Sequence, residues 1–369
     1  MTTQSRALPD NHFAMIMAGG SGTRLWPMSR EAQPKQLVPL IDGRSLLAIS
    51  ADRIASLIAP DNLFVCAAER FRELVHLAVP GLQERNILGE PSGRDTVNAI
   101  GLTAAVLAKR NADARFCVLT ADHLITPEAE FRAALARGFE LLNADSDRLV
   151  TFSITPTHPA TQFGYVERGN ALPDVEGAFI VNHFVEKPDA ETAAEYIASG
   201  KFGWNSGMFV FSAAGYCRAL KRFLPEAWQG LERIAEAWDT ADRGAVLHSV
   251  YPQLPRISVD FAIMEPASTA PDFEVCTVVM DVDWKDVGSW PSLGETLEMD
   301  ADGNASTARV LHIDARNVLA VADDPDHLIA TIGCEDLIIV RTADATLICR
   351  RDRAEEVKKL VDALEARDR

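Results

Sequence analysis

A glycine-rich segment with two nearby cationic side chains could bind a polyphosphate close to the start of this chain. It follows the apolar run Phe13–Met17, which predicts a buried strand, and reads Ala18-Gly-Gly-Ser-Gly-Thr-Arg24. Glycines let the backbone approach a ligand closely, and successive N–H groups in such a turn form an anion nest. Arg24 and Lys35 add positive charges that suit a triphosphate. The segment therefore predicts a binding site for a nucleotide or another polyphosphate.

Two common phosphate-binding loops do not fit this segment. A Walker A loop needs a Gly-x-x-x-x-Gly-Lys-Ser/Thr spacing, which these glycines do not have. A Rossmann fingerprint needs Gly-x-Gly-x-x-Gly at the start of a helix, whereas Pro27 and Pro34 interrupt any early helix here. A glycine-rich turn with no ligand is the alternative that the segment alone leaves open.

Two aspartates in predicted loops could bind a hard divalent cation. Asp122 follows the predicted strand Arg115–Thr120, at the sheet edge where the glycine-rich segment begins. A carboxylate facing a triphosphate is repelled unless a cation lies between them, so we interpret Asp122 as a Mg²⁺ ligand. Asp286, within Trp284–Trp290, could supply the second carboxylate of an octahedral site. The alternatives are a capping or turn aspartate at 122 and a helix-capping turn at 286.

Two further clusters could bind a phosphorylated sugar. Glu186 and Lys187 end a predicted strand before Pro188, and they could bind a sugar hydroxyl and a phosphate respectively. The alternative is a solvent-exposed ion pair. Asn205 could recognise a hydroxyl because its amide carries both donors and an acceptor, although Asn205-Ser-Gly207 is also typical of an ordinary turn.

Glu90 could recognise a guanine base. It begins the segment Glu90–Thr96, which opens a predicted helix and contains Gly93. A carboxylate there can accept from the N1–H and N2–H groups of guanine at once, a match that adenine does not offer. The alternative is an acidic residue that is simply favoured near a helix N-terminus.

The elements that must position these residues alternate between strand-like and helix-like patterns in the first half of the chain. The predicted strands are Phe13–Met17, Asn62–Ala67, Asn86–Leu88 and Arg115–Thr120, and the predicted helices are Leu46–Ile58, Phe71–Ala78 and Thr96–Lys109. This alternation predicts an α/β fold, with a Rossmann-like sheet and helices on both faces. Ligands of such sheets bind beyond the carboxyl ends of the strands.

The pattern changes in the second half of the chain. Four short strands come first, with one helix among them: the strands are Leu149–Ile154, Gly164–Val166, Ala178–Phe184 and Gly207–Phe211, and the helix is Ala190–Ala198. Three helices follow, over Tyr216–Phe223, Glu226–Trp238 and Ala241–Val250. We expect a mixed or antiparallel extension of the sheet that covers the substrate.

The C-terminal part predicts a small β-helix-like module. Five short strands recur at regular spacing between Asp, Asn and Gly turns: Val310–Ile313, Val318–Val321, Leu328–Ile332, Leu337–Val340 and Thr346–Cys349. An amphipathic helix over Arg353–Ala366 closes the module. The turn-rich stretch 300–306 predicts a boundary between a catalytic domain, residues 1–300, and this module, residues 301–369.

Composition and charge exclude several classes of partner. The net charge of −17 argues against binding DNA or RNA, which needs a clustered basic surface. No apolar run is long enough to span a membrane, and the polar Met1–Asn11 lacks the apolar core of a secretory signal, so we expect a cytoplasmic protein. The six cysteines form no Cys-x-x-Cys pair, and Cys66 and Cys117 lie in apolar runs that predict burial rather than ligation or disulfides.

These segments together resemble the sugar-1-phosphate nucleotidyltransferases, and among them the mannose-1-phosphate guanylyltransferases. The matching segments are Met17–Arg30, Pro34–Gln36, Glu90–Thr96, Ala121–His123, Phe184–Pro188, Trp204–Phe209, Ser258–Glu265 and Trp284–Trp290. The resemblance implies a GT-A-like nucleotidyltransferase domain followed by the β-helical module of the shorter members. Because no phosphomannose isomerase domain follows, it also implies that isomerase activity is absent.

The resemblance implies that GTP and mannose 1-phosphate give GDP-mannose and pyrophosphate, by direct in-line attack assisted by Mg²⁺. Four residues would be catalytic: Arg24 on the pyrophosphate, Lys35 near the α-phosphate, and Asp122 and Asp286 on Mg²⁺. The nucleotide would bind at Ala18, Gly19, Gly20, Gly22, Thr23, Arg24, Lys35, Glu90, Gly93 and Asp122, and the sugar phosphate at Gly164, Glu186, Lys187 and Asn205. A homodimer is one oligomeric state to test.

The chain departs from the family pattern at two places. It has Gly93-Arg-Asp-Thr-Val-Asn-Ala99 where the family usually has Gly-Arg-Asn-Thr-Ala-Pro-Ala. It also has Thr161-Gln-Phe-Gly-Tyr165 where the family usually has Thr-Gly-Tyr-Gly-Tyr, so Gln162 leaves the identity of the sugar open. Two alternatives therefore remain: the same chemistry on another sugar 1-phosphate, and a non-catalytic nucleotide-sugar-binding regulatory subunit. The glycine spacing disfavours a nicotinamide dehydrogenase.

Overall fold

The computed structural model describes residues 8–20 and 22–365. Ser21, most of the polar N-terminus and Ala366 of the predicted closing helix lie outside the described residues. The chain divides into two units. The first comprises Met1–Gly19, Ser50–Ala121 and Ile125–Trp284, and the second comprises Gly20–Ile49, Asp122–Leu124 and Lys285–Arg369. No helix among the described residues combines the length and apolarity that a membrane crossing needs.

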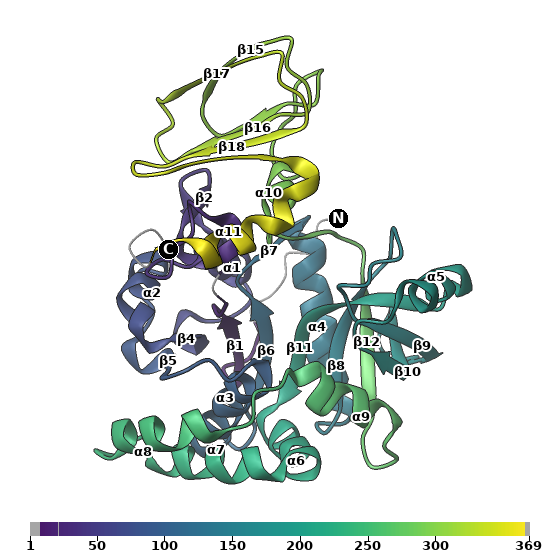
Figure 1. Ribbon diagram of the computed structural model, residues 1–369. Coiled ribbons are helices and arrows are strands. Elements are labelled where there is room, and N and C mark those ends of the chain that lie inside the picture. The colour runs from purple at the N-terminus through teal and green to yellow at the C-terminus, as the bar shows by residue number, and fades with distance from the viewer. Residues whose placement is uncertain (1–7, 21, 366–369) are drawn as a thin grey trace. The chain divides into compact units, whose positions relative to one another are not determined.

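A mixed nine-stranded sheet forms the centre of the first unit (Figure 1). Its strands, in spatial order, are β5 (Ile87–Glu90), β4 (Leu63–Ala68), β1 (His12–Met17), β6 (Arg115–Thr120), β11 (Phe202–Ser212), β8 (Leu149–Ile154), β12 (Val275–Met280), β10 (Ala178–Val185) and β9 (Tyr165–Ala171). The first four strands run parallel, and β11 pairs antiparallel with both β6 and β8. The parallel strands are near-continuous apolar runs because both of their faces are buried.

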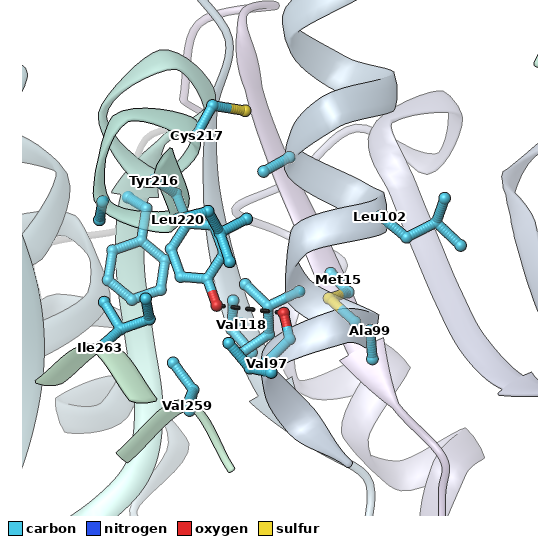
Figure 2. Close-up of a cluster of buried hydrophobic side chains, with 14 of the residues drawn as sticks. Met15, Val97, Ala99, Leu102, Val118, Tyr216, Cys217, Leu220, Val259 and Ile263 are labelled. Atoms are coloured by element: carbon cyan, nitrogen blue, oxygen red, sulfur yellow. Dashed lines mark hydrogen bonds between the residues drawn. The ribbon is translucent and has the colours of Figure 1, made fainter. Parts of the chain in front are cut away.

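Helices cover both faces of this sheet. Neighbouring strand residues point to opposite faces, and on β1 Met15 packs in the core cluster that α3 (Thr96–Arg110) enters with Val97 and Ala99 (Figure 2). On the other face, the His12 ring lies 4.7 Å from the ring of Phe139 in α4 (Glu128–Ala144). The sheet is therefore buried between two helical layers.

The remaining helices surround this sheet or connect its strands. They are α1 (Leu46–Ile54), α2 (Arg72–Ala78), α5 (Ala190–Ser199), α6 (Ala213–Phe223), α7 (Pro225–Ala237), α8 (Arg243–Val250) and α9 (Glu265–Thr269). Local signals define their ends. In α5 the Asp189 carboxylate accepts from the Thr192 N–H at the N-terminus, and Gly200 ends the helix with a φ of +67°.

The second unit contains a β-helical module. The strands β14 (Ala305–Ser306), β16 (Leu319–Ala322) and β18 (Leu337–Arg341) stack in parallel, as do β15 (Arg309–Ile313) and β17 (Leu328–Ile332). Successive strands thus alternate between two sheets, as in a solenoid coil. The strand β19 (Thr346–Arg350) pairs antiparallel with β18, and α11 (Val357–Ala363) follows.

The apolar core of the second unit joins this module to the segment after the glycines. It includes Leu25, Trp26, Trp290, Leu319 and Val340. The Trp290 indole Nε1–H donates to the Trp26 carbonyl at a distance of 3.1 Å. This unit also contains β2 (Pro39–Ile41), β3 (Arg44–Ser45) and α10 (Trp290–Gly294), while the short strands β7 (His123–Thr126) and β13 (Asp283–Asp286) pair with each other.

The expected fold class is confirmed, and most predicted elements lie within a few residues of their observed bounds. Four differences stand out. The helix α1 ends at Ile54 rather than Ile58, and the closing helix begins as a 3₁₀ helix over Arg351–Glu356. The alternative of a turn at Asn205–Gly207 is wrong, because these residues form part of β11 with an irregular register. The sequence patterns also missed α4 and β12, which tertiary packing against the sheet stabilises.

Candidate active site

The glycine-rich segment leaves β1 at the carboxyl end of the sheet. The Ala18 N–H donates to the Cys66 carbonyl of β4 at 2.8 Å, and Ala18 is buried. Gly19 and Gly20 are exposed, and Gly20 has a φ of +96°, which favours glycine. Cys66 and Cys117 are buried free thiols, as expected. The chain thus leaves the buried strand after Ala18 and is exposed from Gly19, at the edge where ligands of α/β sheets bind.

Gly22 is required for Lys35 to pack against this segment. Its φ is +59°, and a Cβ atom there would lie 2.7 Å from both Cβ and Cγ of Lys35. The Ser29 hydroxyl donates to the Gly22 carbonyl at 2.6 Å and holds the turn. Thr23 begins the 3₁₀ helix Thr23–Leu25 that follows. A glycine is therefore the residue that both the backbone angle and the close approach demand.

The buried Lys35 ammonium lies between the two predicted metal-binding carboxylates. Its Nζ is 2.7 Å from Asp122 Oδ2 and 3.8 Å from Asp286 Oδ1, and it donates to the Val287 carbonyl at 3.1 Å. Burial alone would raise the pKa of Asp122, but the charges of Lys35 and His123 outweigh it, so the pKa of this carboxyl is lowered. Both carboxylates therefore belong to one charged cluster with a cation at its centre.

Three side chains of this cluster could hold a metal ion. Ligand atoms of Asp122, His123 and Asp286 all lie within 4.8 Å of one another. Asp286 Oδ1 is buried and has no hydrogen-bond partner among the residues that the structure describes. Such an orphaned oxygen fits a cation, and carboxylate oxygens are the ligands that Mg²⁺ prefers. The sequence pointed to the two aspartates; His123, which it did not assign, lies directly beside them.

The alternatives of simple capping roles for these aspartates are not supported. Asp122 lies in a turn between two strands, β6 and β7, so it is a turn aspartate and not the cap of a helix. The helix after Asp286 is capped by Ser289, whose hydroxyl accepts from the Ser292 N–H, while the Ser292 hydroxyl accepts from the Ser289 N–H. The cap of α10 is therefore supplied without Asp286.

Arg24 has an acidic partner that the sequence did not predict. Its Nη1 lies 2.8 Å from Glu355 Oε2, in the 3₁₀ helix Arg351–Glu356, and both side chains are exposed. The guanidinium also lies near Gly288, since a Cβ atom at this position would be 3.4 Å from Arg24 Nη2 and 3.4 Å from Asp286 Oδ1. The structure thus brings Arg24, Lys35, Asp122 and Asp286 together within the second unit.

Glu90, predicted to bind a base, ends β5 in the first unit. Its Oε1 accepts from the Tyr251 hydroxyl at 2.6 Å. Burial raises the pKa of Glu90, while the Tyr251 hydrogen bond opposes this effect. Asn98, one of the residues that depart from the family pattern near Glu90, has a structural role. Its buried amide donates to the carbonyls of Arg94 and Pro255. Gly93 of the same loop is exposed.

The four residues predicted to bind the sugar phosphate also come together in the first unit. The Asn205 N–H donates to the Gly164 carbonyl at 2.8 Å. A Cβ atom on Gly164 would lie 2.4 Å from Glu186 Oε2 and 3.3 Å from Asn205 Cβ, so glycine is needed for these side chains to meet. Glu186 Oε1 lies 2.6 Å from Lys187 Nζ, but only Lys187 is exposed, which differs from an ordinary surface pair.

Backbone strain marks the same region. Lys187 has a φ of +50° and Asp95 a φ of +66°, values that L-residues rarely adopt and that concentrate at functional sites. Burial alone would lower the pKa of Lys187, but its hydrogen bond to Glu186 and the nearby carboxylates raise it. Gln162, whose departure from the family pattern leaves the identity of the sugar open, is exposed.

Asp260 is a further acidic group of this region, and the sequence assigned it no role. Its Oδ1 accepts from Asn205 Nδ2 at 2.9 Å. Burial and the charge of Glu186 raise the pKa of Asp260 from 3.8 to about 7. The signal that could have found it is its place within Ser258–Glu265, a segment that resembles the family.

We expect Asp260→Asn to gain stability relative to the unsubstituted protein as the pH rises from about 4 to about 7. In this window the folded protein binds a proton at Asp260 that the unfolded chain does not, so the stability of the unsubstituted protein falls with rising pH. The difference in the free energy of unfolding between the two proteins grows by at most about 1.4 kcal/mol per pH unit. Urea unfolding at several pH values measures it, and a pH-independent difference would contradict the raised pKa.

Comparisons with known proteins show which families the two parts of the chain match. Residues 13–303 match the family described as "Nucleotidyl transferase", and residues 308–364 match "MannoseP isomerase/GMP-like beta-helix domain". The xanthan biosynthesis protein XanB of Xanthomonas campestris is 39% identical over 363 residues, which are 96% of this chain and 73% of that protein. The mannose-1-phosphate guanylyltransferase of Klebsiella pneumoniae is 39% identical over 361 residues, 96% of this chain and 74% of that protein.

A solved structure gives the same result. The protein described as mannose-1-phosphate geranyltransferase from Thermus thermophilus superposes with a TM-score of 0.83 at 31% identity. The superposition covers 95% of this chain and 98% of that chain. This agreement extends over the sheet and the β-helical module. The chain belongs to the nucleotidyl transferase family, in the group formed by the mannose-1-phosphate guanylyltransferases.

Proposed function

We propose that this protein is a mannose-1-phosphate guanylyltransferase, which converts GTP and mannose 1-phosphate to GDP-mannose and pyrophosphate. The observation that carries the proposal is the buried Lys35 between Asp122 and Asp286, next to the glycine-rich segment. This arrangement suits chemistry on a triphosphate, since such sites work by positioning and by charge neutralisation. The relatives named mannose-1-phosphate guanylyltransferase support the choice of both substrates.

The reaction needs no general base, because the attacking oxygen of the sugar phosphate is already anionic at neutral pH. This oxygen forms a bond to the α-phosphorus of GTP, and the bond from that phosphorus to the β-phosphate bridging oxygen breaks. Lys35 neutralises the α-phosphate, and Arg24 holds the departing pyrophosphate. Asp122 and Asp286 would hold Mg²⁺, which would supply positive charge to the triphosphate. The backbone from Ala18 to Thr23 cradles the phosphates.

The remaining residues recognise the two organic groups. Glu90 accepts from the guanine edge, with Gly93 leaving room in the same loop. Glu186 and Asn205 bind sugar hydroxyls beside Gly164, and Lys187 binds the sugar phosphate. The charge and hydrogen-bonding capacity of each side chain suit these roles.

A pyrophosphate-release assay tests this function directly. The purified chain is incubated with Mg²⁺, each of four nucleoside triphosphates and a panel of hexose and heptose 1-phosphates. The proposal expects GTP and mannose 1-phosphate to give the highest kcat/KM. A higher value with another sugar 1-phosphate would favour the alternative left open by Gln162, and absence of turnover with every pair would favour a regulatory subunit.

We predict that Glu355→Gln lowers the KM for GTP by about 2- to 5-fold without changing kcat, since exposed ion pairs contribute up to about 1 kcal/mol. The physical reason is that the triphosphate must displace Glu355 from Arg24 before Arg24 can bind it. Asp352→Asn is the matched control, because Asp352 lies in the same 3₁₀ helix and pairs with Arg350 instead. An unchanged KM in Glu355→Gln would show that the ion pair does not compete with GTP.

Three further expectations stay predictions: the domain boundary near residue 300, a homodimer, and a location in the cytoplasm. Size-exclusion chromatography with light scattering tests the homodimer.

A further inference from the structure

We infer that Asp260 is a positioning residue that holds the Asn205 carboxamide in one orientation, so that Asn205 presents a single N–H donor to a hydroxyl of the sugar. This inference rests on the proposed function, in which Asn205 contacts the sugar. Asp260 lies outside the set of site residues predicted from the sequence, and its contact fixes the orientation of the Asn205 amide.

The hydrogen bonds of Asn205 leave one polar position unused. Its Oδ1 accepts from the Thr151 hydroxyl at 3.0 Å and from the Gly207 N–H at 3.2 Å. Its Nδ2 donates one hydrogen to Asp260 Oδ1 at 2.9 Å. A carboxamide has two acceptor positions and two donor hydrogens, so both acceptor positions and one hydrogen are occupied. No described residue accepts the second Nδ2 hydrogen, which therefore remains for a ligand.

The partners of Asn205 also exclude the flipped amide. A backbone N–H can only donate, so Gly207 requires an oxygen opposite it, and this requirement turns the Asn205 nitrogen towards Asp260, whose Oδ1 accepts from it. A flip would oppose the Asn205 nitrogen to the Gly207 N–H and leave that N–H unpaired. Because Asn205 is buried, this defect would be destabilising.

The backbone around Asp260 is itself fixed. Val259 and Ile263 are fully buried in the core cluster beneath α3 and α6 (Figure 2). The Val259 N–H donates to the Thr96 hydroxyl at 2.8 Å. Asp260 begins a π-helical turn that ends at Met264, a rare geometry that is frequent at functional sites. The acceptor that orients Asn205 is therefore held by the interior of the unit.

The resulting pair is chemically complementary to a hydroxyl group. Glu186, which lies against Gly164 beside Asn205, can only accept when ionised, whereas Asn205 in this orientation can only donate. A sugar hydroxyl both donates and accepts, so it satisfies both side chains at once. A hydroxyl of the other configuration, or its absence, leaves a buried donor unpaired.

A double-mutant cycle tests the inference. Asp260→Ala, Asn205→Ala and the double variant are compared in pyrophosphate release, with the KM for each substrate measured separately. We expect Asp260→Ala to raise the KM for the sugar phosphate about 10- to 50-fold and the KM for GTP less than 2-fold. The double variant should be no worse than Asn205→Ala alone, because Asp260 acts through Asn205.

Conservative variants and a control separate positioning from folding. Asp260→Asn keeps an acceptor oxygen and should restore most of the sugar-phosphate affinity, while Asp260→Glu displaces the oxygen and should restore less. Asp272→Ala is the control, since Asp272 is an exposed acidic residue paired with Arg222. If Asp260→Ala does not fold, the comparison of Asp260→Asn with Asp260→Glu still decides.

The outcomes are distinct from a failure of the proposed function. Absence of turnover in the unsubstituted protein refutes the function, whereas the inference concerns only the variants of an active enzyme. Additive effects in the double variant, equal increases in both KM values, or equal affinities in Asp260→Asn and Asp260→Ala would each overturn the positioning role. A panel of monodeoxy sugar 1-phosphates adds a check: Asp260→Ala should remove the discrimination at one hydroxyl only.

Discussion

Asp122→Ala and Asp286→Ala are each expected to reduce kcat for pyrophosphate release on the order of 10³-fold, because in the proposed function each would remove a ligand of the cation on the triphosphate. The two carboxylates lie on either side of the Lys35 ammonium, and the buried Asp286 Oδ1 lacks a hydrogen-bond partner among the described residues. Steady-state assays at saturating substrates measure the effect. Asp281→Ala, an exposed aspartate near Asp286 in the sequence, is the matched control.

Removal of metal should reproduce this loss in the unsubstituted protein. Chelation with EDTA is expected to abolish turnover, and added Mg²⁺ should restore it. Restoration by Zn²⁺ but not by Mg²⁺ would instead point to His123 as a ligand, since imidazole suits transition metals. Activity in EDTA, or unchanged turnover in both aspartate variants, would refute the metal assignment.

Lys35→Met is expected to lower both activity and stability, which distinguishes it from the aspartate variants. The substitution keeps the length of the side chain but leaves Asp122 and Asp286 without their buried cation. Breaking a buried ion pair by removing one partner costs about 3–5 kcal/mol. The kcat should fall on the order of 10²- to 10³-fold, because the positive charge on the α-phosphate is lost as well.

The stability effect of Lys35→Met offers a second readout. Thermal unfolding is measured with and without Mg²⁺, and Mg²⁺ is expected to raise the Tm of Lys35→Met more than that of the unsubstituted protein. The reason is that the cation relieves the repulsion between the two carboxylates. Lys359→Met, at an exposed position of α11, is the control and should change neither quantity. A Lys35→Met protein with normal kcat would exclude Lys35 from catalysis.

Several site features were predictable because they are local in sequence. The apolar run before Ala18 forms β1, and Asp122 comes two residues after the end of β6, so both positions follow the carboxyl ends of neighbouring parallel strands. The strand end before Glu186 was equally clear, because Pro188 cannot continue a strand. Periodicity and turn residues act over a few positions, so they reveal such sites without knowledge of the fold.

The sequence by itself determined the α/β class, the strand that leads into the glycine-rich segment, and the types of side chain available for a triphosphate and a sugar. Only the tertiary structure decided which of them meet. Lys35 reaches the Val287 carbonyl across 252 residues, Tyr251 reaches Glu90 across 161, and Asp260 reaches Asn205 across 55. Such contacts depend on how distant elements pack, and no local pattern encodes that packing. The contacts of Glu355 with Arg24 and of Asp260 with Asn205 are therefore seen only in the tertiary structure.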